Sequence, residues 1–213
     1  LMFFVTIFCA ACYEPTEGCL DISATNFNAA ADDPCEDCCT YPNLKLTILH
    51  NVTQQRPLLA DTCINHSADS TYTNGDNNFF QIKNISFYLS DFELVKSDGS
   101  VVEVEDELTL QLYEDFVTET TKDSVIKDDI VLIERGPFNY TIGEFRTPGL
   151  YIQLRFKVGL DAGINDADPD TLATSHPLSS NQDMHYEDLS LGYIFQQFEI
   201  VEDTATNLME IEV

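Results

Sequence analysis

The sequence predicts an all-β protein, an antiparallel β-sandwich or barrel-like domain with a small cysteine-bounded motif in front of it. Short segments that alternate apolar and polar residues recur along the chain, and turn residues separate them. No long stretch shows the period of an amphipathic helix. With 213 residues, 44% of them hydrophobic, the chain is long enough to bury one sizeable core.

The expected strands follow one another from residue 44 to the end of the chain. The first, 44–50, alternates apolar and polar side chains, and 97–100 is a hairpin turn between two apolar runs. The further strands expected are 79–82, 85–89, 92–95, 101–104, 130–133, 151–156, 193–200 and 208–213. Between the last strands lies a polar loop, 161–183, of a length that is usually functional or disordered.

The first twelve residues predict export. Residues 1–11 are mostly apolar but far shorter than the ~20 residues that cross a bilayer, so we interpret 1–12 as the remnant of a signal peptide. Cys9-Ala10-Ala11-Cys12 resembles a bacterial lipobox, which would make Cys12 the lipidated residue. We therefore expect an exported protein, lipid-anchored at the outer membrane on its periplasmic or surface face. The alternative is a plain cleaved signal without lipid.

Residues 13–43 form a distinct segment that resembles a cysteine-bounded motif common in exported proteins of Bacteroidota. The segment has too few apolar residues for a core of its own, so cross-links or cations must hold it. An exported compartment permits disulfides. The cysteines expected to form them are Cys19, Cys35, Cys38, Cys39 and Cys63. This number is odd, so one is left over, and Cys19 is expected to bridge to Cys38 or Cys39.

Composition and motifs exclude several classes of function. The formal net charge of −27 repels phosphate backbones, so nucleic acid is not an expected partner, whereas cations are attracted. The chain contains no Gly-x-Ser-x-Gly, Walker, His-Glu-x-x-His or dinucleotide-binding pattern. We therefore expect a binding protein and not an enzyme.

Two segments far apart in the chain carry a family resemblance. The first is 84–94, with Tyr88-Leu89-Ser90 at its centre, and the second runs from 149–160 through Asn165…Asp168-Pro169 to Gly192-Tyr193. In that order and spacing, residues 44–213 resemble the MbnP-like family of copper-binding proteins of the bacterial envelope. The resemblance implies a Cu(I) site made of histidines and a tryptophan that can be oxidised to kynurenine.

The chain departs from that implied site because it contains no tryptophan. Met184-His185-Tyr186 occupies the corresponding stretch, and Tyr186 stands nearest to the missing indole. Thioether and imidazole groups both suit copper, and His50 ends an expected strand. We therefore expect His50, Met184, His185 and Tyr186 to hold copper for acquisition or delivery, with an envelope protein as partner in metal handling. The alternative for Met184 is packing in the core.

The acidic loop is a second, weaker candidate for a cation. Asp161, Asn165, Asp166, Asp168 and Asp170 offer hard oxygen ligands of the kind that Ca²⁺ prefers. The same Asn and Asp side chains can instead bond their own backbone and set turns.

A different class of function stays open from the residues alone. The domain would then be a β-sandwich interaction module without metal that binds an envelope protein or a glycan. The missing tryptophan is the feature that favours this alternative.

Overall fold

The computed structural model describes residues 14–54, 62–76, 78–136, 138–202 and 207–212. The chain divides into two compact units: Leu1–Pro42 with Arg146–Pro148, and Asn43–Phe145 with Gly149–Val213. None of the helices in the described ranges has the length and apolar character needed to cross a membrane. Cys12, the expected lipidation site, lies outside the described residues.

The larger unit is built from antiparallel strands, which confirms the predicted all-β fold class. Its strands are β3 (Asn43–Thr47), β4 (Asn51–Gln54), β5 (Thr62–Asn65), β6 (Tyr72–Thr73), β7 (Phe79–Lys96), β8 (Val101–Glu103), β9 (Glu107–Asp115), β10 (Thr120–Lys127), β11 (Val131–Glu134), β12 (Asn139–Glu144), β13 (Tyr151–Val158), β14 (Gln196–Glu202) and β15 (Asn207–Glu212).

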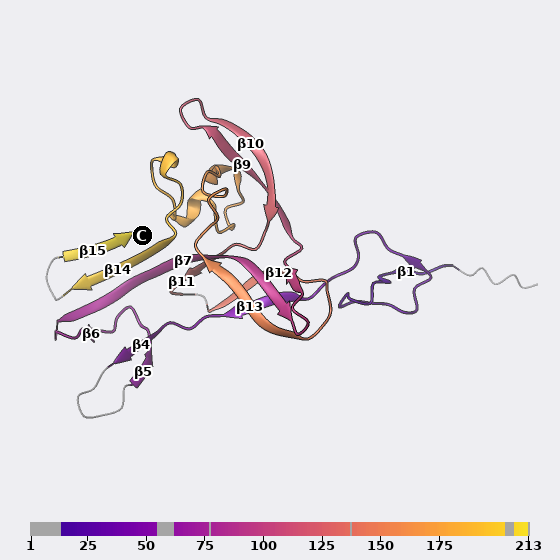
Figure 1. The fold of residues 1–213 in the computed structure, drawn as a ribbon, viewed down its shortest axis with the longest axis horizontal. Coiled ribbons are helices and arrows are strands. Elements are labelled where there is room, and N and C mark those ends of the chain that lie inside the picture. Colours follow the sequence, from indigo (N-terminus) through magenta and orange to yellow (C-terminus); the bar gives the residue numbers. More distant parts are fainter. Residues whose placement is uncertain (1–13, 55–61, 77, 137, 203–206, 213) are drawn as a thin grey trace, which may run out of the picture. The chain divides into compact units, whose positions relative to one another are not determined.

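The central element is β7, an unbroken strand of 18 residues where the sequence predicted three shorter ones. Its first half pairs with β14, its middle with β11 and its second half with β13, while β6 and β8 pair with its two ends. Figure 1 shows β14 beside the first half of β7 and β13 beside the second half. Five strands of the larger unit therefore pair directly with one segment of chain.

A hydrophobic cluster covers each face of this sheet. Tyr88 and Leu132, which face each other across β7 and β11, point into a cluster formed with β9, β10 and the long segment between β13 and β14. Their neighbours Leu89 and Ile133 point the other way, into a cluster formed with β3, β8 and β12. The alternation of side chains along a strand thus gives β7 two buried faces. This arrangement makes the unit a sandwich.

A bulge interrupts the pairing of β7 with β13. Two residues of β7, Asp91 and Phe92, face only Phe156 on β13, and Asp91 has a left-handed backbone with φ of 53°. A bulge leaves backbone groups of the ladder unpaired. The buried Asp129 supplies a partner, because its Oδ2 accepts a hydrogen bond from the Phe92 N–H at 2.7 Å. Burial raises the pKa of this carboxyl group.

The segment expected to be a functional or disordered loop, 161–183, instead supplies core residues. It contains the short 3₁₀ helices η1 (Pro169–Thr171) and η2 (Ser180–Gln182), and a third, η3 (Leu189–Leu191), follows before β14. Leu178 within the loop and Met184 just after it are almost fully buried. The Tyr88 hydroxyl donates to Pro177 O at 2.9 Å, and the Tyr193 hydroxyl donates to Leu178 O at 2.8 Å. The Tyr88 hydroxyl therefore joins this segment to β7, and the Tyr193 hydroxyl joins two parts of the region between β13 and β14.

Residues of the family resemblance meet in the same region. The Asn165 Oδ1 accepts a hydrogen bond from the Tyr193 N–H at 2.8 Å, and Gly192 has φ of 75°. A Cβ atom on Gly192 would lie 2.1 Å from the Asn165 amide nitrogen. Glycine is required here both by the backbone conformation and by the space that Asn165 occupies.

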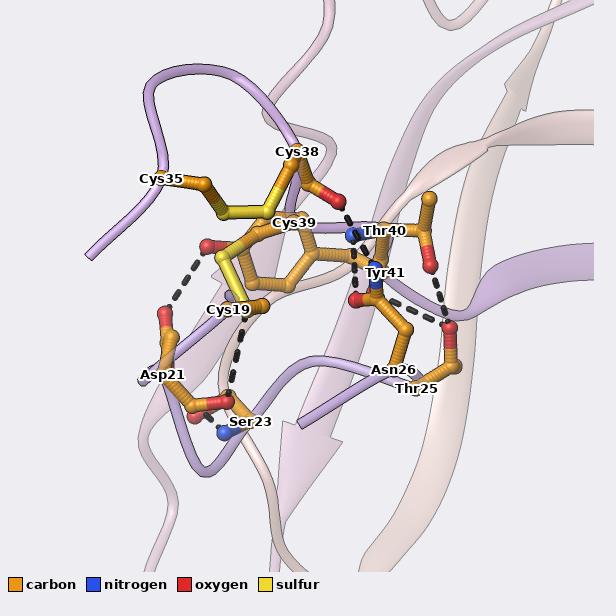
Figure 2. The surroundings of a disulfide bond; sticks show 10 residues. All are labelled: Cys19, Asp21, Ser23, Thr25, Asn26, Cys35, Cys38, Cys39, Thr40 and Tyr41. Carbon is orange, nitrogen blue, oxygen red and sulfur yellow. Dashed lines mark hydrogen bonds between the residues drawn. A yellow bond between two sulfur atoms is a disulfide. The ribbon is translucent and has the colours of Figure 1, made fainter. Parts of the chain in front are cut away.

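Two disulfides hold the small unit, which also contains the two-residue strands β1 (Glu17–Gly18) and β2 (Asp33–Pro34), paired in parallel. Cys19 bridges to Cys39, one of the two alternatives expected, and Cys35 bridges to Cys38 (Figure 2). The prediction that Cys63 is a disulfide cysteine is wrong. Cys63 lies exposed on β5 as a free thiol, because the other four described cysteines pair among themselves.

We expect Gly192→Ala to destabilise the protein by about 2–4 kcal/mol, because it adds a clash with Asn165 to a left-handed backbone. Urea unfolding followed by circular dichroism measures the change. Gly75→Ala is the matched control, since a Cβ there meets nothing within 4 Å, and it should change stability by less than about 0.5 kcal/mol. Equal effects of the two substitutions would contradict the role given to Gly192.

Candidate functional site

Two histidines face each other at the open end of the β4–β5 hairpin. Asn51 pairs with Asn65, and the next residues outward are His50 and His66. The backbone continues the ladder there, because His66 N–H donates to His50 O at 2.7 Å. Residues directly opposite in an antiparallel pair project to the same side, with Cβ atoms about 4.5–5.5 Å apart. The hairpin therefore brings together two imidazoles that are 16 positions apart in the sequence.

The hydrogen bonds around His66 assign its tautomer. Its Nδ1 lies 3.0 Å from the Tyr72 hydroxyl oxygen, which also accepts from the Ser67 N–H at 2.9 Å and lies 3.3 Å from Ser67 O. All three contacts are satisfied when Tyr72 donates to Ser67 O and accepts from the Nδ1–H of His66. The Nε2 of His66 then carries a lone pair. This atom is buried and has no hydrogen-bond partner.

His50 has the complementary arrangement. Its Nε2 lies 3.2 Å from Glu134 O, and a carbonyl oxygen can only accept, so this nitrogen is the N–H donor. The Nδ1 of the neutral ring then carries the lone pair. The ring also meets Phe87 of β7 edge-on, with centroids 6.3 Å apart. In each histidine one ring nitrogen is bonded to a protein oxygen, and the other carries a lone pair that can bind a metal ion. Histidines in metal sites have this arrangement.

Electrostatics keep His66 in the ligand form. Burial lowers the pKa of His66, and the nearby charges of Arg135 and His50 lower it further. A lowered pKa means that the imidazole remains neutral at lower pH than a free imidazole, and only the neutral form binds a metal. The pair can therefore offer two nitrogen donors in a half-buried position.

The residues expected beside His50 lie elsewhere in the fold. Met184 is 2% exposed and packs in the core around Tyr88. His185 bonds Tyr186 O through Nδ1 at 3.0 Å and meets the Tyr193 ring edge-on, while Tyr186 packs against the same core. Within the described ranges, no group of three imidazoles, thiolates or carboxylates includes His50 or His185. The structure thus places the side chain of Met184 in a packing position.

Of the five residues proposed for calcium, Asp161, Asn165 and Asp168 use their side chains in contacts with other protein groups. Asn165 bonds the Tyr193 backbone, and Asp161 pairs with Lys157 at 2.6 Å. Asp168 caps η1 by accepting from the Asp170 N–H at 3.0 Å, and the Asp166 carbonyl accepts from the Tyr113 N–H. Over the described part of the chain these carboxylates form no three-ligand group. The contacts of Asn165 and Asp168 with backbone N–H groups match the turn-setting alternative.

A cavity of about 560 Å³ lies beside the fourth histidine, His176. Its Nε2 donates to Asp128 Oδ1 at 3.2 Å, and its Nδ1 accepts from the Leu178 N–H at 3.1 Å. Both ring nitrogens are therefore occupied by protein groups. His176 offers no free donor, in contrast to His50 and His66.

His66 was not recognised as a site residue from the sequence. Its nearness to His50 depends on the hairpin register, which pairs Asn51 with Asn65. A usable signal was present, since 51–54 and 62–65 both contain β-branched residues and the two histidines flank them symmetrically. Tyr72, which orients His66, comes from β6 and could be placed only by the fold.

The fold and the site define a β-sandwich protein with a pair of histidines at the open end of its β4–β5 hairpin. A family model described as MbnP matches residues 41–213, and the chain belongs to this family. Among solved structures, MbnP from Methylosinus trichosporium is similar, with 14% sequence identity, a TM-score of 0.49, and coverage of 81% of this chain and 62% of that chain. No curated protein matches the chain.

We expect Arg135→Ala to raise the pKa of His66 toward its ordinary value, because it removes a positive charge that disfavours protonation. An NMR titration of the imidazole signals measures the pKa directly. The matched control is Arg155→Ala, whose guanidinium lies by Glu93 and is not among the causes of the shift. A His66 pKa that is unchanged by Arg135→Ala would contradict the assigned electrostatic environment.

Proposed function

We propose that this protein binds copper through His50 and His66. The observation that carries the proposal is the buried, unpartnered Nε2 of His66, next to a second imidazole whose Nδ1 is also free to accept a ligand. Imidazole is a common ligand of copper, and copper heads the affinity order of the divalent first-row metals. The resemblance to copper-binding MbnP-like proteins supports the choice of this metal.

The donor set fits Cu(I) better than it fits zinc. Cu(I) accepts two opposed nitrogen ligands, whereas zinc sites in proteins take about four ligands. Tyr72 and the Glu134 carbonyl would orient the two rings from outside the first coordination sphere. The chain has no tryptophan, so no kynurenine can form and the histidines have to suffice.

The proposed role is acquisition or delivery of copper and not catalysis. Export and a lipid anchor at Cys12 would place the protein at the outer membrane, where a soluble envelope protein could supply or receive the ion. The net charge of −27 favours the approach of cations. These assignments of place and partner rest on the sequence motifs alone.

A second candidate function is the binding of an envelope protein without metal. The observation that favours it is the exposed apolar surface of β13, where Ile152 and Val158 are 65% and 55% exposed. Among the described strands β13 pairs only with β7, so its outer edge is open to another chain. Copper binding by the histidines and protein binding by β13 can be tested separately.

We expect the purified chain to bind about one Cu(I) per molecule in competition with a chromophoric Cu(I) chelator. His66→Ala and His50→Ala should each abolish this stoichiometric binding, because each removes one of two ligands. Tyr72→Phe should keep the site but weaken it by about 10–100-fold, since His66 loses its orienting partner.

His176→Ala and His185→Ala are the matched controls, and neither should change the stoichiometry. Loss of copper in His185→Ala but not in His66→Ala would move the site to the region of Met184 and Tyr186. No copper bound by the wild-type chain would overturn the proposal and favour the protein-binding alternative.

A further inference from the structure

The small unit gathers sulfur atoms more densely than any other described part of the chain. The Sγ atoms of Cys35, Cys38 and Cys39 all lie within 4.8 Å of one another. They form the one three-ligand group of imidazole, thiol or carboxylate donors in the described residues. Figure 2 shows the two disulfides side by side, joined through the adjacent residues Cys38 and Cys39.

The two disulfides differ in what they contribute to the unit. Cys19–Cys39 closes a loop with a sequence separation of 20, and Cys19 is 2% exposed. Cys35–Cys38 has a separation of only 3, and both of its cysteines are half-buried. Loop-closure entropy stabilises a fold less when the loop is short. A reductant therefore reaches Cys35–Cys38 more readily than the buried Cys19, and opening this bond removes little of the stabilisation that the cross-links provide.

The backbone holds both cysteines in place independently of their S–S bond. Cys35 N–H donates to Gly18 O at 3.1 Å. The Cys38 carbonyl accepts from the Asn26 Nδ2 at 2.7 Å, while the Asn26 Oδ1 accepts from the Thr40 N–H at 2.9 Å (Figure 2). After reduction the two thiols would remain near each other and near the Cys39 sulfur. Such a pair is organised in advance for a shared ligand.

We propose that Cys35 and Cys38 form a redox-gated Cu(I) site, closed as a disulfide and open as a dithiolate. A dithiol reductant breaks the Cys35–Cys38 bond by thiol–disulfide exchange, forms its own disulfide, and leaves two electrons and two protons on the two cysteine thiols. Cu(I) then binds the pair, and the two thiol protons are released to solvent. Thiolates are the soft ligands that select Cu(I). This site does not depend on the histidine pair.

The test uses the full chain with Cys63→Ser, which removes the unrelated free thiol. Limited treatment with dithiothreitol, followed by alkylation and peptide mass mapping, should modify Cys35 and Cys38 before Cys19 and Cys39. The reduced protein should bind about one more Cu(I) than the oxidised protein, and X-ray absorption should show sulfur neighbours for the added copper.

Two variants decide the outcome. Cys35→Ala with Cys38→Ala should keep the Cys19–Cys39 bridge and lose the added copper, whereas His66→Ala should retain it. The proposal is overturned if reduction adds no copper, if the added copper persists in the double variant, or if all four cysteines are reduced together. Copper at the histidine site is measured in the oxidised protein, where X-ray absorption should show nitrogen neighbours. A negative result for one site therefore does not prevent the test of the other.

Discussion

A strand buried on both faces is the constraint from which the larger unit follows. β7 runs through 18 residues, and its alternating side chains point into two separate hydrophobic clusters. Each face requires a cover, which β9, β10 and the 159–195 segment supply on one side and β3, β8 and β12 on the other. The local cost of the long strand is the bulge at Asp91, where Asp129 is buried to satisfy a backbone N–H.

The candidate copper site depends on the same strand. Phe87 on β7 contacts His50, and Phe80 on β7 pairs with Tyr72, the residue that orients His66. The two imidazoles come from the ends of a short hairpin that has little core of its own. Their positions are therefore set by contacts with the sheet at least as much as by the hairpin.

The residues that identify the family and the residues that offer metal donors belong to different groups. Asn165, Gly192 and Tyr193 meet one another and Tyr88, so in this chain they fasten a long segment to β7. Packing of this kind can be maintained while a ligand is exchanged or lost. A chain without tryptophan can thus keep the MbnP fold, and the metal donors proposed for it are nitrogen atoms in one unit and sulfur atoms in the other.

The sequence by itself determined the fold class, the order of most strands and the presence of a cross-linked N-terminal unit, because these depend on local alternation, turn residues and cysteine spacing. It predicted a disulfide from Cys19 to Cys38 or Cys39, and the structure decided for Cys39. Strands β4, β5, β6, β9, β10 and β12 were not predicted: β4, β5 and β6 are only two to four residues long, whereas β9 does alternate apolar and polar residues at 108–112 and could have been found. Only tertiary structure decided that Met184 is a core residue and that His66 is the neighbour of His50, because both facts arise from contacts between segments distant in sequence.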